Sequence, residues 1–406
     1  MKKVWQNTGW QILGRIVASL SSLVVTAFLT RLLSGQNYGN WIFVTTFTLL
    51  FLNFSDLGVS LIAVAQAARA SKPKAVYQRA FFLKFWLALF SWLVFVFFVL
   101  VLPQFKNLIS VGLIASLTIL FLSLRMTAEI VFRTELDFKK KVFFESLGSL
   151  LFLLAIVSVG GLRFWPLNQT LTMVFWTSTA GVSSLLAFFS VRKTFEFKSF
   201  PSFVETKKLF SQSLPLGIRQ LVFATYDQGI DNFFLKTFST SLNVGFYGLS
   251  YKIYNNLTTT ASFLMNSLFP LIARQNKPLL KKTFLKSLIV LFFSGVFLSL
   301  GLWFFSGLII QWLAGPKFQS SVAILRILSL ALVISFLNHS IGYTMIALGE
   351  QKKLLRLSLV ALGVNLGGNL IFIPRWAGVG AAWITVATET TMFLLTARAL
   401  RKLINC

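Results

Sequence analysis

Residues 80–102 read AFFLKFWLALFSWLVFVFFVLVL and contain a single charged side chain, Lys84. A bilayer core needs about 20 consecutive apolar residues in a helix, so this stretch is long enough to cross a membrane. The rest of the chain has the same character, since 56% of the 406 residues are hydrophobic and only 12% are charged. Soluble proteins carry roughly 25% charged residues. The sequence therefore predicts an all-α, polytopic membrane protein.

Apolar segments of similar length recur along the whole chain. We expect twelve spans, at residues 8–33, 38–67, 80–102, 108–132, 142–162, 169–191, 210–236, 242–272, 284–314, 319–347, 354–373 and 377–398. Most of the 38 Lys and Arg residues fall in every second connection between the spans. We assign Lys84, near the start of its span, to one of these basic connections. Cytoplasmic connections are the ones that accumulate Lys and Arg. This distribution predicts cytoplasmic termini and attributes the net charge of +27 to membrane topology rather than to a nucleic-acid partner.

The bulk composition excludes several kinds of chemistry. The only His is His339 and the only Cys is Cys406, so neither a His-rich nor a Cys-based metal site is expected. No P-loop motif occurs, which argues against an ATPase within the chain. The outer connections are too short for a catalytic domain. We therefore expect a transporter in the cytoplasmic membrane, without a cofactor, rather than an enzyme.

A weak internal repeat divides the chain into two halves. Tyr38-Gly39 and Tyr247-Gly248 start corresponding spans, and the pattern A-R-x-x-K-P follows at 68–73 and again at 273–278. We infer two pseudo-symmetric six-helix lobes, 1–197 and 198–406, in parallel orientation. Transporters built from such repeats hold their substrate between the repeats.

Ionisable residues within spans are the candidate functional groups, because they are costly at bilayer depth. Arg219, Asp227 and Asp231 are separated by eight and then four residues, which places them on one face of a single helix. The two carboxylates are candidates for coupling to a proton or a sodium ion. The alternative is an Arg–Asp network that only holds the lobe together.

Further polar residues favour an anionic substrate. Arg15, Arg219 and Lys252 are candidate ligands of a diphosphate, whereas a cation exporter would favour carboxylates without these cations. Lys252 has a second interpretation, a pair with Asp227 or Asp231, and Arg15 could extend to the interface. The secondary cavity candidates are Gln11, Asp56, Asn255, Asn256 and Glu389.

Several stretches, taken in order, resemble a known family. They are NTGWQILGR (7–15), TRLLSGQNYG (30–39), FSDLG (54–58), SLPLGIR (213–219) and the region 231–248. The chain resembles oligosaccharide flippases of the polysaccharide transporter family, within the multidrug/oligosaccharidyl-lipid/polysaccharide (MOP) exporter superfamily. Arg15 and Asp231 fall inside the matching stretches.

This resemblance implies a V-shaped, MATE-like fold and a specific activity. Such a protein would move a polyprenyl-diphosphate-linked oligosaccharide from the inner to the outer leaflet by alternating access, with polysaccharide polymerases as partners. Lipid II flippases of the superfamily carry fourteen helices, so twelve spans favour an O-antigen (lipopolysaccharide), capsule or exopolysaccharide unit. The alternatives are an ion-coupled drug or cation antiporter of the same superfamily and, less favoured, a membrane glycosyltransferase or ligase.

Overall fold

The computed structural model describes residues 2–162, 167–195, 201–228, 230–272, 275 and 277–405. These residues form thirteen α-helices and three short 3-10 helices, with no β-strand among them. The chain divides into two compact units, Met1–Ala224 and Thr225–Cys406. The all-α prediction is confirmed for the described residues.

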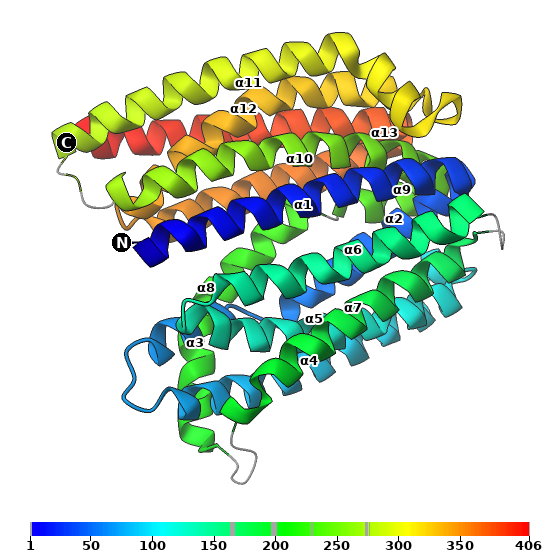
Figure 1. The fold of residues 1–406 in the computed structure, drawn as a ribbon. Coiled ribbons are helices and arrows are strands. Elements are labelled where there is room, and N and C mark those ends of the chain that lie inside the picture. The colour runs from blue at the N-terminus through cyan, green and yellow to red at the C-terminus, as the bar shows by residue number, and fades with distance from the viewer. Residues whose placement is uncertain are drawn as a thin grey trace. The chain divides into compact units, whose positions relative to one another are not determined.

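The first unit contains seven helices and most of an eighth. They are α1 (Lys2–Leu32), α2 (Gly35–Phe54), α3 (Val59–Ala67), α4 (Pro73–Val101), α5 (Ile109–Thr134), α6 (Phe138–Leu162), α7 (Gln169–Val191) and α8 (Phe203–Gln228). The helix α5 packs against α4 and α7, and α1 packs against α6 (Figure 1).

The second unit is built from five helices. They are α9 (Ile230–Phe238), α10 (Ser241–Ile272), α11 (Lys277–Ala314), α12 (Ser321–Ala347) and α13 (Gln351–Asn405). The helix α12 packs against α10, α11 and α13, which lie side by side in Figure 1. Within α13, Ala377 has non-helical dihedrals (φ 45°, ψ −126°). The helix is therefore kinked there, between the two spans that the sequence predicts.

Each predicted span falls on one or two helices of the described residues. Eight helices are long and apolar enough to cross a membrane, or nine if α2 and α3 form one bent span. The kinked α13 covers two predicted spans. Helices α8, α9 and α10 lie outside that apolar set and contain many polar residues, including Arg219 and Lys252.

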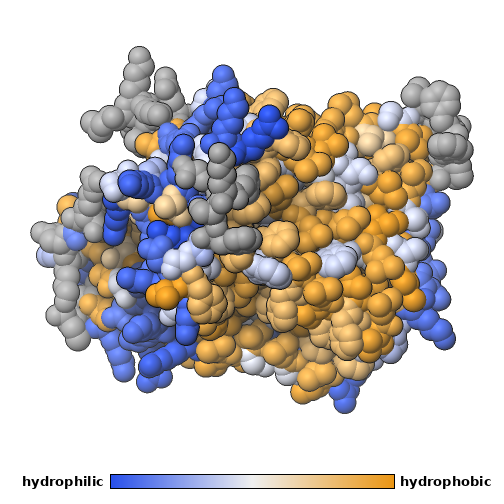
Figure 2. Space-filling view, turned by 90° about the horizontal axis from the view of Figure 1, so that it is seen from below, coloured by the Kyte–Doolittle hydropathy of each residue, from blue (hydrophilic) through white to orange (hydrophobic). Residues whose placement is uncertain are grey.

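The surface has the hydropathy that a bilayer requires. The most exposed faces of α4 and α11 carry large apolar side chains, among them Phe90 (64% exposed), Phe297 (76%) and Trp312 (75%). Figure 2 shows a broad hydrophobic area with hydrophilic residues gathered toward its edges. Apolar side chains on this scale stay exposed only where lipid or another protein covers them.

One predicted span, 38–67, is interrupted, and the expectation of a continuous helix is wrong for it. The span breaks between α2 and α3, where Leu57 (φ 40°) and Gly58 (φ 77°) adopt left-handed conformations. The predicted span 210–236 is covered by α8 and α9, which flank residue 229, a position outside the described residues. The placement of Arg219, Asp227 and Asp231 on one face of a single helix therefore stays a prediction.

The repeat is visible in matching details of the two units. Tyr38 and Tyr247 are fully buried near the starts of α2 and α10. The 3-10 helices Pro103–Phe105 and Pro316–Phe318 also correspond: each joins a long helix to the next one in its unit and buries its Phe completely. The second A-R-x-x-K-P copy lies partly outside the described residues.

Candidate functional site

A buried carboxylate in the second unit receives hydrogen bonds from three neutral side chains of the described residues. Asp231, on α9, is 6% exposed. Its carboxylate accepts hydrogen bonds from Tyr247 Oη at 2.5 Å, Asn369 Nδ2 at 2.6 Å and Asn365 Nδ2 at 3.3 Å. Tyr247 lies on α10 and the two Asn residues lie on α13. Three helices of one unit therefore converge on one acidic group.

Further oxygen atoms surround this carboxylate. Tyr247 Oη lies 3.0 Å from Thr385 Oγ1, and Asn369 Nδ2 donates to Asn365 Oδ1 at 3.1 Å. The Oδ1 atom of Asn369 is buried and has no hydrogen-bond partner among the described residues. Buried amide oxygens are normally satisfied, so this atom marks a position at which a further donor or a cation is needed.

The kink in α13 brings both of its halves to the site. Asn365 and Asn369 precede Ala377, while Thr385 follows it, yet all belong to one hydrogen-bond network. The two halves approach closely, because a Cβ on Gly380 would lie 2.5 Å from the carbonyl oxygen of Phe372. A side chain at residue 380 would push the halves apart.

Chemically, the Asp231 cluster is suited to a small cation. Carboxylate, amide and hydroxyl oxygens are the ligands that hard cations prefer, and a carboxylate can instead take up a proton. An ionised carboxylate buried among neutral groups is costly, so a bound cation or proton would stabilise this arrangement. No cluster of three or more His, Cys, Asp or Glu side chains occurs in the part of the chain that the structure describes.

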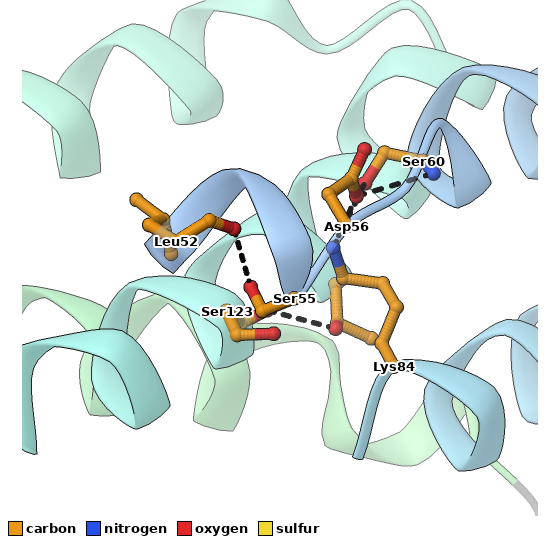
Figure 3. Close-up of polar contacts among 7 residues, drawn as sticks. Leu52, Ser55, Asp56, Ser60, Lys84 and Ser123 are labelled. Carbon is orange, nitrogen blue, oxygen red and sulfur yellow. Dashed lines mark hydrogen bonds and ion pairs between the residues drawn. The ribbon is translucent and has the colours of Figure 1, made fainter. Parts of the chain in front are cut away.

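The first unit also buries a carboxylate, but this one has an ammonium group as its partner. Lys84 Nζ forms an ion pair with Asp56 at the break between α2 and α3, and the two side chains are 1% and 5% exposed. Ser60 Oγ donates to Asp56 and accepts from Lys84 at 3.1 Å (Figure 3). Assigning Lys84 to a cytoplasmic connection is therefore wrong, because its charge is buried against Asp56.

The break between α2 and α3 packs closely against α8 at two glycines. A Cβ on Gly217 would lie 2.4 Å from the carbonyl carbon and oxygen of Leu57. A Cβ on Gly58 would lie 2.8 Å from the carbonyl oxygen of Ser213. The backbones of the break and of α8 can approach this closely only because both positions lack side chains.

The predicted diphosphate ligands are divided between the units. Arg15 is exposed on α1, as is the secondary cavity candidate Gln11, and Arg219 is half-buried on α8. Lys252 is half-buried on α10 of the second unit. The side chain of Asp227 lies outside the described residues.

The remaining candidates lie on α10 and α13. Asn255 Oδ1 accepts a hydrogen bond from Thr258 at 3.3 Å. The Nδ2 atom of Asn256 is buried without a hydrogen-bond partner among the described residues. Glu389 accepts from Asn338 Nδ2 at 2.6 Å. These three candidates therefore all lie in the second unit.

Sequence reasoning missed most of the residues that surround Asp231. Tyr247 was noted only as part of a repeat, and Asn365, Asn369 and Thr385 were not singled out. The spacing of Asn365 and Asn369 was an available signal, since residues four apart lie on the same face of a helix. Two amides on one face of an apolar span indicate a polar partner.

Solved structures share this fold. A lipid II flippase, MurJ, in an inward closed conformation superimposes with a TM-score of 0.77 and 15% identity, covering 98% of this chain and 87% of that one. An inward-facing multidrug resistance MATE family transporter of the MOP superfamily also has a TM-score of 0.77 and 15% identity, covering 95% of each chain. A MOP superfamily transporter from Pyrococcus furiosus gives 0.68 and 16%, covering 98% and 96%.

These likenesses confirm a MATE-like fold for a multi-pass membrane protein. No curated protein matches the sequence. Residues 4–276 match the family described as "Polysaccharide biosynthesis protein". The chain belongs to this family, as the motif resemblance predicts, and its fold is that of MOP transporters.

Proposed function

We propose that the protein is a flippase that moves a polyprenyl-diphosphate-linked oligosaccharide from the inner to the outer leaflet of the cytoplasmic membrane. The observation that carries this proposal is the polysaccharide biosynthesis family match over residues 4–276 on a chain with the MOP transporter fold. The glycan would be an O-antigen, capsule or exopolysaccharide repeat unit, passed on to polymerases at the outer face.

The transport cycle that we propose is alternating access of two lobes, 1–197 and 198–406. The cations Arg15, Arg219 and Lys252 would bind the diphosphate, since charge-assisted hydrogen bonds to phosphate are strong. The prenyl tail would stay in lipid. Both termini would be cytoplasmic, in keeping with the distribution of Lys and Arg.

A cation or proton bound at Asp231 would drive the cycle. Asp56 already has a counter-charge in Lys84, whereas the hydrogen bonds to Asp231 come from neutral groups. The ion would bind where the Asn369 amide oxygen and the Asp231 carboxylate lie together. Asp227 stays a second candidate for this role.

The alternative function is a drug or cation antiporter of the same superfamily. Two observations favour it: the likeness to a multidrug resistance MATE transporter and the acidic Asp231 cluster. This alternative predicts that an organic cation, rather than an anionic lipid, is the substrate.

Native mass spectrometry of the purified protein separates the two functions. For a flippase we expect a co-purified polyprenyl-diphosphate glycan that is lost in the double variant Arg15→Ala, Arg219→Ala. The variant Arg375→Ala is the control, because this arginine is exposed and donates a hydrogen bond to the carbonyl oxygen of Ile371 at 2.8 Å within its own helix. If no such lipid is bound, and an organic cation binds in a manner that requires Asp231, the flippase proposal is wrong.

A translocation assay in proteoliposomes completes the test. Wild-type protein should move a short-chain prenyl-diphosphate oligosaccharide from one leaflet to the other. The double arginine variant should be inactive while keeping the wild-type melting temperature. Full activity in that variant would show that transport does not require either arginine.

A further inference from the structure

Charged side chains from α5 and α6 form a continuous row in the first unit. Arg125 Nε lies 3.4 Å from Glu129 Oε1, and Lys141 Nζ lies 3.8 Å from Glu129 Oε2. The same Lys141 Nζ lies 2.7 Å from Glu145 Oε2. Arg125, Glu129 and Lys141 are 17–21% exposed in their side chains. Lys141 is thus shared between two carboxylates.

The helix α1 adds a third cation to this row. Gly14 lies directly against Val142, where a Cβ would be 2.4 Å from Val142 Cγ1, so α1 and α6 are in close contact next to Arg15 and Lys141. Arg15 is near enough to Glu145 to interact with it electrostatically. The rings of Phe132 and Phe144 stack at 5.8 Å and hold α5 against α6.

The cluster has more positive than negative charge. Arg15, Arg125 and Lys141 face two carboxylates, and Arg133 also interacts electrostatically with Glu129. This excess of positive charge attracts further anionic charge to the cluster.

The two carboxylates resemble the ligand that such a cluster would take. Glu129 on α5 and Glu145, one turn after Lys141 on α6, present two anionic groups that Lys141 bridges. A diphosphate likewise presents two linked anionic groups. Arginine side chains can bind phosphate oxygens with two parallel hydrogen bonds, and lysine contributes a compact positive charge.

We propose that Arg125 and Lys141, together with Arg15, form a diphosphate-binding site on the first unit, in which Glu129 and Glu145 are internal anions that a bound diphosphate displaces. This inference rests on the proposed function, since it names the residues that would receive the head group of its substrate. It adds Arg125 and Lys141 to Arg15 as ligands of the diphosphate. It also assigns Glu129 and Glu145 the role of competing with the diphosphate for these cations.

The proposal predicts opposite effects for the two kinds of residue. Removing Arg125 and Lys141 weakens diphosphate binding by about tenfold or more, the loss of at least one charge-assisted contact. Replacing both carboxylates, as Glu129→Gln with Glu145→Gln, strengthens binding because the internal competitors are gone. A purely structural salt-bridge network would not give tighter binding in the second variant.

Lys140 provides a matched control. It is the neighbour of Lys141 in the same basic run, yet its side chain is 59% exposed and pairs with Asp137 at 2.9 Å. Lys140→Ala removes the same charge from the same turn of helix without touching the cluster. The affinity of the Lys140→Ala variant for diphosphate should stay within about twofold of wild type, because an exposed ion pair contributes little.

The experiment measures binding to full-length protein in nanodiscs of phosphatidylcholine, by isothermal titration calorimetry. The probes are farnesyl diphosphate and inorganic pyrophosphate, with phosphatidylglycerol nanodiscs as a competitor arm. Both diphosphates should bind through the cluster, and farnesyl diphosphate should bind more tightly if the prenyl chain contributes. If phosphatidylglycerol abolishes binding, the cluster recognises lipid phosphate in general and the assignment to diphosphate is overturned.

The remaining outcomes distinguish this site from the proposed function. Unchanged affinity in Arg125→Ala with Lys141→Ala, or no gain in the Gln variant, overturns the site. If those variants also translocate the glycan normally, the flippase function stands without this site. Failure of the wild-type protein to translocate any prenyl-diphosphate glycan would instead refute the proposed function itself.

Discussion

The ammonium of Lys84 is paired with the carboxylate of Asp56 at the break between α2 and α3, where both side chains are almost completely buried. The pair joins the third predicted span to the interruption of the second. Ser60 completes it by donating to the carboxylate and accepting from the ammonium. The first unit thus neutralises its own buried acid.

Removing one partner of this pair should destabilise the protein strongly. Lys84→Met leaves Asp56 buried without a counter-charge, which costs about 3–5 kcal/mol. The double variant Asp56→Leu, Lys84→Met should recover most of this loss, because two apolar groups need no solvation. Thermal unfolding followed by Trp fluorescence measures the stability of the single and the double variant. Lys140→Met is the exposed control, and an equal loss in that variant would contradict the argument.

Asp231→Asn should uncouple transport from its driving ion. The amide keeps the size of the side chain but removes the charge that a cation or proton requires. We expect glycan translocation to lose its dependence on an imposed Na⁺ or proton gradient, while substrate binding persists. Glu205→Gln is the control, since Glu205 is 51% exposed and pairs with Arg79 at 2.9 Å. Unaltered gradient dependence in Asp231→Asn would exclude Asp231 as the coupling site.

Asn369→Ala tests the same cluster through a neutral residue. It removes a 2.6 Å hydrogen bond to Asp231 and the unsatisfied amide oxygen beside it. Loss of this amide oxygen removes one ligand of the ion, so ion affinity should fall by roughly tenfold or more, about 1.4 kcal/mol per tenfold. Equilibrium binding of radioactive sodium, and its competition by protons, measures the change. Equal affinities in the variant and the wild type would mean that this amide is no ligand.

Gly217→Ala should perturb the contact between α8 and the broken helix. The added methyl group would lie 2.4 Å from Leu57 backbone atoms, which cannot rotate away as a side chain could. We expect a lower melting temperature and reduced transport. Gly301→Ala is the matched control on α11, because nothing lies within 4 Å of a Cβ there. That control should be neutral or more stable, by up to about 1 kcal/mol from helix propensity.

The predicted orientation can be tested with the single native thiol. Cys406 is the only cysteine in the sequence, and cytoplasmic termini require it to face the cytoplasm. A membrane-impermeant maleimide should label it in inside-out vesicles and not in intact cells. Lys317→Cys in a Cys406→Ser background should show the opposite pattern, because Lys317 lies in a predicted outer connection. Labelling of Cys406 from outside would reverse the topology.

The helices were predictable because their signals are local. A run such as residues 80–102 contains within itself the length and the apolar character that a spanning helix needs. The interruption of the span 38–67 was harder to predict. Gly58 lies at it, but the left-handed Leu57 also packs against Gly217 on α8. The helix propensity of the residues near Gly58 cannot reveal a contact with a residue so far away in the sequence.

The sequence by itself determined that this is an all-helical membrane protein of the polysaccharide biosynthesis family, since composition, span length and motif order are properties of short stretches. It also indicated Asp231 as a buried acid. Only the tertiary structure decided the partners of the buried charges. Lys84 meets Asp56, and Asn369 meets Asp231, across long separations in the chain. The partner of a buried charge depends on which helices pack next to it, and this packing is determined by the whole unit rather than by a short stretch of sequence.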